Sequence, residues 1–156
     1  MAFDLIIREA RPFGHDAAAP SVDIGITGDR ITAIQPDLGE AAEVIDAGGR
    51  LVSPGLIESH IHLDKSRILD RCSASERDGR DHMERVSVVK PSFTVEDVYT
   101  RAKATLERCL VHGTMHMRTH VELDPNVGLR GFEALKELAS DYRWAIDLDL
   151  CVFAQE

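Results

Sequence analysis

Two histidines separated by a single residue are the feature of the sequence that most clearly suggests chemistry. His60 and His62 lie in the stretch Leu51 to Asp64, in which a Pro-Gly pair precedes a short apolar segment. Side chains of a strand alternate between its two faces, so the two imidazoles would share one face with Glu58 and Asp64. Two neutral imidazoles at such positions can bind one divalent transition metal through their ring nitrogens. The spacing therefore predicts that His60 and His62 bind one metal ion together, rather than that each is an isolated core histidine.

The same stretch resembles the first barrel strand of the amidohydrolase superfamily. Within that superfamily it is similar to the cytosine deaminase group, which includes the enzyme that removes isopropylamine from N-isopropylammelide. Two later stretches, His112 to Glu122 and Leu150 to Glu156, carry further motifs in the family's order. The resemblance covers essentially the whole chain, but it corresponds only to the beginning of the family's chain.

The first 50 residues read as short strands joined by turns. Apolar runs at 4–8, 22–26 and 31–34 alternate with turn residues, and Gly28-Asp29 has the chemistry of a hairpin. These residues predict a small antiparallel unit that is too thin to be stable alone. The resemblance implies that residues 1–52 form part of a small β-sandwich, which strands from the far C-terminus complete in the family.

From residue 53 onward, strands and helices alternate. The strand of the histidine pair is followed by a polar segment at 66–92, which we interpret either as a solvated insertion or as a lid over the substrate. A helix then runs from a cap at Thr94 to Gly113. The chain continues as a strand at 114–123, a helix at 129–142 and a strand at 145–153. This order predicts parallel strands joined by right-handed crossovers.

Each predicted strand has one apolar and one polar face. This favours a barrel over an open doubly wound sheet, whose strands are apolar on both faces. The alternative is an α+β sheet with its polar side in solvent. A complete eight-stranded barrel needs roughly 250 residues, and the chain has 156. We therefore expect an α/β protein in which residues 53–156 form the first three strands of a (β/α)8 TIM-like barrel, completed by the remainder of the polypeptide or a second chain.

Under the resemblance, His60 and His62 are ligands of one divalent metal ion, zinc or iron. A third His, an Asp and the acid/base Glu and His would come from beyond residue 156, so the 156 residues alone are expected to be inactive. The metal would generate hydroxide from bound water, which attacks a ring carbon bearing an amine. The resemblance also places Gln155 against the heterocycle, where its carboxamide can donate and accept hydrogen bonds together. The alternative for Gln155 is a side chain exposed to water.

Three further residues form a second tier of candidates. His120 would line the site or orient a ligand through a hydrogen bond. Asp64 and Lys65 would support the metal ligands or simply close the end of the strand. Arg118 and Glu122, on the same predicted face as His120, are expected to pair with each other or to join a network, because buried charges need partners.

Composition narrows the classes of function. The net charge of −9 argues against nucleic acid and anionic membranes as partners, and no apolar run approaches the roughly 20 residues of a membrane span. No secretory signal is visible at the N-terminus, and the three cysteines are widely spaced. We therefore expect no disulfide framework, and we expect the protein to be cytoplasmic. We also expect a homo-oligomer.

Together these features predict a metal-dependent hydrolytic deaminase that acts on a cytosine-like or aminotriazine heterocycle, with water as the second reactant. One alternative is a cyclic amidase of the same superfamily. The other is a non-catalytic αβ binding or assembly module that carries the histidine pair.

Overall fold

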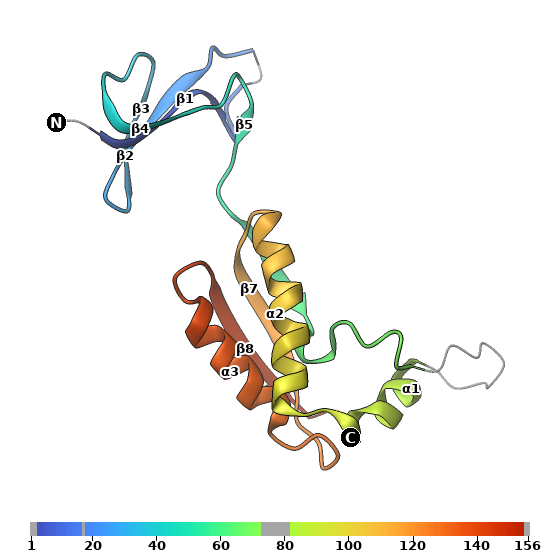
Figure 1. Cartoon of the computed structure of the whole chain (residues 1–156). Helices are drawn as coiled ribbons and strands as arrows, with labels where there is room; N and C mark the ends of the chain where they lie inside the picture. Colours follow the sequence, from blue (N-terminus) through green and yellow to red (C-terminus); the bar gives the residue numbers. More distant parts are fainter. Residues whose placement is uncertain (1–2, 17, 73–81, 155–156) are drawn as a thin grey trace. The chain divides into compact units, whose positions relative to one another are not determined.

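The computed structural model describes residues 3–16, 18–72 and 82–154. The chain folds into two compact units, Met1–Pro54 and Gly55–Glu156 (Figure 1). Among the described residues, no helix is both long enough and apolar enough to cross a membrane.

The first unit is a five-stranded sheet. Its strands are β1 (Phe3–Pro12), β2 (Val22–Thr27), β3 (Arg30–Gln35), β4 (Ala41–Asp46) and β5 (Leu51–Val52). The strand order is β3-β2-β1-β4, and β5 pairs with the end of β1. The predicted hairpin is confirmed, because β2 and β3 are antiparallel and turn between Thr27 and Arg30.

The prediction that this unit is purely antiparallel is wrong. Both β4 and β5 run parallel to β1. Parallel neighbours need a long connection, and here the β2–β3 hairpin forms that connection between β1 and β4. A hairpin signal identifies the direction only of the two strands that it joins, so the sequence did not reveal the parallel pairs.

The first unit leaves several large apolar side chains open. Its core contains Ile6, Ala10 and Ile24, whereas 47% or more of the surface is exposed at the following residues: Ile31, Ile34, Val44, Ile45 and Leu51. Sheets in globular domains normally cover such residues with a second layer. The exposure agrees with the expectation that residues 1–52 form only part of a β-sandwich, which stays a prediction.

The second unit is a three-stranded parallel sheet with its two longer helices packed on one face (Figure 1). The strands β6 (Leu56–Ile61), β7 (Thr114–Glu122) and β8 (Asp147–Phe153) lie in that order, and both pairings are parallel. The short 3-10 turn η1 (Leu63–Lys65) follows β6, α2 (Val95–Val111) precedes β7, and α3 (Arg130–Tyr142) connects β7 to β8. The predicted alternation of parallel strands and helices is confirmed.

The helices and one face of the sheet share a hydrophobic core. Its buried residues come from η1, α2, α3, β7 and the residue before β8: Leu63, Ala102, Leu106, Leu135, Leu138, Met117, Val121 and Ile146. The opposite face of the sheet is polar and exposed, with His116, Arg118, Asp147 and Asp149 on it. Strands β7 and β8 therefore have the predicted apolar and polar faces. In β6 the prediction is wrong at two residues, because Ile57 pairs with His116 on the open face and is 73% exposed, whereas Glu58 pairs with the buried Met117.

Helix α2 has the boundaries that the sequence predicts. Thr94 Oγ1 accepts a hydrogen bond of 3.1 Å from the backbone N–H of Asp97, which caps the first turn. After the helix, Gly113 adopts a φ of +91°, a conformation that favours glycine. These two residues determine where the chain enters and leaves the helix that supports the site.

The segment predicted as a loop at 66–92 contains helical structure. α1 (His82–Val89) and the 3-10 turn η2 (Lys90–Ser92) occupy its second part. Val86 of α1 packs into a small cluster with the buried Phe93 and Ile68. Two helical turns are too short to show a period in sequence, which explains the incorrect prediction. Residues 73–81 lie outside the described part of the chain, and whether this segment is an insertion or a lid stays a prediction.

Candidate functional site

Three imidazole rings meet at the carboxyl ends of β6 and β7. His60 lies in β6, His62 follows that strand directly, and His120 lies in β7. The ring centroid of His62 is 5.4 Å from that of His60 and 5.5 Å from that of His120. His60 and His120 stack with centroids 4.0 Å apart and planes inclined by 22°. The structure thus brings the predicted pair together and adds His120 to it.

The end of β8 contributes an aromatic ring to the same place. The ring centroid of Phe153 lies 5.5 Å from that of His62, with the two ring planes at 74°, and 6.4 Å from that of His120. The sequence does not mark Phe153 as a site residue, because one phenylalanine in a strand usually indicates packing alone. Gln155 follows two residues later, outside the described residues, so its predicted role has no structural counterpart here. All three strands therefore place rings at one point, as the ends of parallel strands allow.

The chain leaves the strand before Asp64, which corrects the predicted face of this residue. Leu63–Lys65 form η1, so the strand alternation does not continue past His62. The backbone N–H of Leu63 donates to Oγ1 of the buried Thr119 at 3.0 Å and draws the turn towards β7. Asp64 is consequently buried, and its Oδ2 accepts a hydrogen bond of 3.0 Å from the backbone N–H of Glu122.

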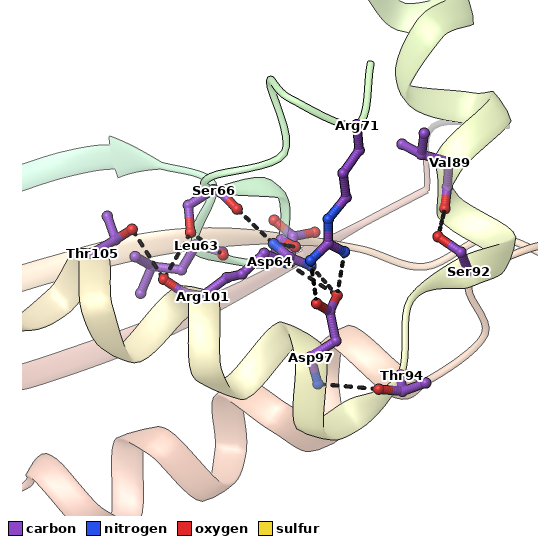
Figure 2. A network of polar contacts seen from close by, with 10 residues as sticks. All are labelled: Leu63, Asp64, Ser66, Arg71, Val89, Ser92, Thr94, Asp97, Arg101 and Thr105. Carbon is purple, nitrogen blue, oxygen red and sulfur yellow. Dashed lines mark hydrogen bonds and ion pairs between the residues drawn. The ribbon is translucent and has the colours of Figure 1, made fainter. Parts of the chain in front are cut away.

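An arginine of α2 holds the same turn (Figure 2). The guanidinium of Arg101 donates to the backbone carbonyl oxygens of Asp64 at 3.1 Å and Ser66 at 2.6 Å. Asp97 accepts hydrogen bonds from Arg101 at 3.0 and 3.1 Å and from Arg71 at 2.6 and 3.0 Å. This network connects the turn after the histidine pair to the helix behind the sheet.

Arg101 is a residue of this network that the sequence does not mark. Its side chain is almost completely buried, and its Cζ lies 4.7 Å from the centroid of the Phe93 ring. The signal in the sequence is its spacing of four residues from Asp97, but such helical pairs usually lie in solvent. Its spacing of three residues from the buried Val98 places Arg101 on the inward face of the helix.

Several polar atoms around the rings lack partners. Among the described residues, Nδ1 of His62, Nδ1 of His120 and Oδ1 of Asp64 are buried without a hydrogen bond. The atoms His62 Nδ1 and Asp64 Oδ1 are 4.0 Å apart, which is too long for a hydrogen bond. A buried polar group without a partner costs roughly 1–3 kcal/mol. Imidazole nitrogens and carboxylate oxygens with free lone pairs suit a divalent cation as ligands.

The arrangement fits a metal held by a pair of histidines. In the part of the chain that the structure describes, no three His, Cys, Asp or Glu side chains are placed to hold a metal ion. The lone pairs of stacked rings lie in two nearly parallel planes, so one ion cannot lie in the planes of both His60 and His120 at bonding distance. The tilted rings of His60 and His62, with planes at 53°, do not have this restriction. His120 is therefore a neighbour of the pair rather than a third ligand.

The surroundings of His62 favour its neutral form. Burial lowers the pKa of His62 below its ordinary value, and the ammonium of Lys65 and the rings of His120 and His60 lower it further. The carboxylate of Glu122 acts in the opposite direction. His62 is therefore neutral at pH 7, which is the form in which an imidazole binds a metal.

Of the two alternatives predicted for Arg118 and Glu122, the ion pair between them does not form, whereas Glu122 does join a charged network. Nη2 of Arg118 lies 3.5 Å from Oδ2 of Asp149 on the exposed face of the sheet. The carboxylate of Glu122 is buried and contacts Nζ of Lys65 at 2.9 Å and Nζ of Lys90. Glu122 pairs in register with Phe153, so it keeps the face predicted for it and differs from the prediction only in its partners.

Comparison with known proteins gives a consistent result. Residues 43–141 match the sequence profile of the Amidohydrolase family. The N-isopropylammelide isopropyl amidohydrolase of Pseudomonas sp. strain ADP is 34% identical over 167 residues, which cover 98% of this chain and 39% of that protein. The chain thus spans about two fifths of the length of this relative.

Two crystal structures are similar to the chain at comparable coverage. The N-isopropylammelide isopropylaminohydrolase from Burkholderia multivorans has a TM-score of 0.74 at 26% identity, over 96% of this chain and 37% of the other. The 5-methylcytosine deaminase from Klebsiella pneumoniae, liganded with 5-fluorocytosine, has a TM-score of 0.73 at 28% identity, over 93% and 35%.

Proposed function

Because the chain belongs to the amidohydrolase family, we propose that it supplies the metal-binding histidine pair, His60 and His62, and the first barrel strands of a metal-dependent hydrolytic deaminase. The substrate is a cytosine-like or aminotriazine heterocycle. The observation that carries the proposal is the meeting of His60, His62 and His120 at the carboxyl ends of β6 and β7. Among the described residues, Nδ1 of His62 and Nδ1 of His120 are buried there without a hydrogen-bond partner.

The substrate class rests on the relatives. They are named for N-isopropylammelide and 5-methylcytosine, and each of these is a nitrogen heterocycle with an amine outside the ring. Hydrolysis at the amine-bearing carbon requires activated water on one side and a proton for the ring nitrogen and the leaving amine on the other. We propose that the acid/base Glu and His for this step come from beyond residue 156.

His60 and His62 are the residues that would hold the metal, zinc or iron. When bound, such a metal lowers the pKa of its water towards neutrality and so provides hydroxide. Burial and Lys65 keep His62 in the neutral form that can bind. The ring of His120 stacks on His60 and restricts its rotation, and the edge-on ring of Phe153 covers one side of His62.

Lys65 and Gln155 are the proposed contacts to the heterocycle. Nζ of Lys65 lies 5.3 Å from the centroid of the Phe153 ring, which places an ammonium beside the imidazole cluster. From there it can donate to a carbonyl or a ring nitrogen of the substrate. Gln155 follows Phe153 on the same strand, and its carboxamide suits a carbonyl with an adjacent N–H.

We further propose that β6, β7 and β8 are the first three strands of a (β/α)8 barrel and that residues 1–52 are part of a β-sandwich. The parallel strand order, the helices on one face and the open polar face support this arrangement. The rest of the polypeptide or a second chain would then supply the remaining strands and metal ligands.

An amine-release assay tests the proposed reaction. The native protein is incubated with cytosine and with N-alkylated aminotriazines, and released ammonia or alkylamine is measured. We expect release by the wild type and a loss of more than about 100-fold in His62→Ala. The control is His116→Ala, because His116 pairs with Asp147 on the open face at 3.2 Å and lies outside the ring cluster.

The alternatives give different results in the same assay. Ring opening without amine release would support a cyclic amidase instead. Absence of any turnover would favour the non-catalytic module. Equal activity of His62→Ala and the wild type would contradict the role of the histidine pair.

A further inference from the structure

The largest fully buried side chain among the described residues is that of a lysine. Lys90 lies in η2, directly after α1, and only 2% of its surface is exposed. A lysine is rarely buried to this extent unless its charge is paired. Its Nζ donates to Oε1 of Glu122 and, at 3.2 Å, to Oδ2 of Asp124. Lys90 is therefore enclosed with two carboxylates at the carboxyl end of β7.

Glu122 divides its two carboxylate oxygens between two lysines. Oε1 accepts from Lys90, and Oε2 accepts from Nζ of Lys65 at 2.9 Å. Lys65 is the residue whose ammonium lies beside Phe153 and lowers the pKa of His62. The Glu122 carboxylate is thus the connection between the buried Lys90 and the cation at the imidazole cluster.

The backbone fixes this connection at both ends. The N–H of Glu122 donates to Oδ2 of Asp64 at 3.0 Å, which fixes the end of β7 against η1. Oδ1 of Asp124 accepts from the backbone N–H groups of Asn126 at 2.6 Å and Val127 at 3.0 Å. The main chain of Glu122 and the carboxylate of Asp124 are thus held in place, and we infer that the contact with Lys90 sets the orientation of the Glu122 carboxylate towards Lys65.

Stability alone does not account for this arrangement. Replacing buried ion pairs by apolar residues is often neutral or stabilising, whereas a buried charge network can fix one geometry. We propose that Lys90 is a positioning residue, which acts through Glu122 to hold the Lys65 ammonium beside the imidazole cluster for contact with the heterocycle. This inference rests on the proposed function for its consequence, but not for its geometry.

Two measurements that compare the Lys90→Met variant with the native protein test whether Lys90 positions Lys65. The first is the rate at which Lys65 is reductively methylated, followed by mass spectrometry of the peptide that contains it. We expect a several-fold faster methylation, because Glu122, the partner of Lys65, is then no longer held in one orientation by Lys90. The second is kinetics with an N-alkylated aminotriazine, for which we expect KM to rise about tenfold or more and kcat to change less than about threefold.

The matched control is Arg8→Met in the first unit. Arg8 also pairs with a buried carboxylate, Asp23, at 3.2 Å and donates to two backbone carbonyls. The control should lower stability without changing KM or the methylation of Lys65. A Lys90→Met protein that matches the control in both measurements would overturn the inference.

A second variant covers the case in which Lys90→Met does not fold. The double variant Lys90→Met/Glu122→Gln removes both charges of one buried pair. Its Lys65 should be methylated at the same rate as in Glu122→Gln alone, because Glu122→Gln already breaks the connection between Lys90 and Lys65. Independent, additive effects of the two changes would overturn the inference. If the wild type turns over no heterocycle, the proposed function fails, while the methylation rates still decide whether Lys90 holds Lys65.

Discussion

The imidazole rings of His60 and His120 stack across two neighbouring strands, with centroids 4.0 Å apart. The pairing of β6 with β7 is irregular between Glu58 and Ile61, which is where His60 lies. Within this irregularity the backbone N–H of His60 donates to Oε1 of Glu58 at 2.9 Å. The strand pair therefore departs from regular geometry at the point where the rings meet, and this departure accompanies the stack.

The stack should contribute to metal binding. Aromatic pairs contribute roughly 0.5–1.5 kcal/mol, so His120→Ala should weaken binding by about twofold to tenfold. His120→Phe keeps a flat ring against His60 and should retain most of the affinity. Competition with a chelating dye measures the Kd of each variant. If His120→Ala binds as tightly as the wild type, the stack does not position the ligand.

The buried arginine behind the site should be important for stability. In Arg101→Met the carbonyl oxygens of Asp64 and Ser66 lose a charged donor, so we expect a loss of about 2 kcal/mol. Arg67→Met is the matched control, because Arg67 is exposed and contacts α2 through Thr105. The control should change stability by less than about 0.5 kcal/mol. Thermal unfolding compares the two, and equal shifts in Tm would contradict the assigned role of Arg101.

The carboxylate of Asp97 should make stability depend on pH. Hydrogen bonds from Arg71 lower its pKa most, burial acts in the opposite direction, and Arg101 lowers the pKa further. A carboxyl group with a lowered pKa stabilises the fold above its unfolded pKa of about 4, and this contribution disappears as the pH falls through the folded value.

Asp97→Asn should therefore be less stable than the wild type at pH 7 by about 1 kcal/mol, the upper end for pairs open to solvent. The difference should shrink below about pH 4, where both proteins carry a neutral side chain. Urea unfolding at pH 7 and at pH 3 measures it. A difference that stays constant between these values would show that the charge of Asp97 is not responsible.

Local patterns in the sequence predicted the framework of the second unit. Alternation placed His116, Arg118 and His120 on one face of β7, and the Thr94 cap with Gly113 defined α2. In β6 the irregular pairing between Glu58 and Ile61 interrupts the alternation, which the sequence did not reveal. These features depend on residues a few positions apart, which is the range over which strand and helix periods act. The parallel order followed from the alternation of the elements.

The contacts that surround the site were not predictable in the same way. Lys65 and Glu122 are 57 positions apart, and the sequence contains no signal that favours this pair over Arg118 with Glu122. The face of Asp64 changed because a hydroxyl of another strand ends β6 early. Partners of buried charges are chosen by the three-dimensional packing, which local periodicity does not describe.

The metal content of the native protein tests the central claim most directly. Elemental analysis of the wild type and of the control His116→Ala should find about one equivalent of zinc or iron per chain. His60→Ala and His62→Ala should retain less than about a tenth of that amount, because each removes one imidazole of the pair. A metal content in His60→Ala and His62→Ala that equals that of the wild type would contradict the assignment of these two histidines as the metal ligands.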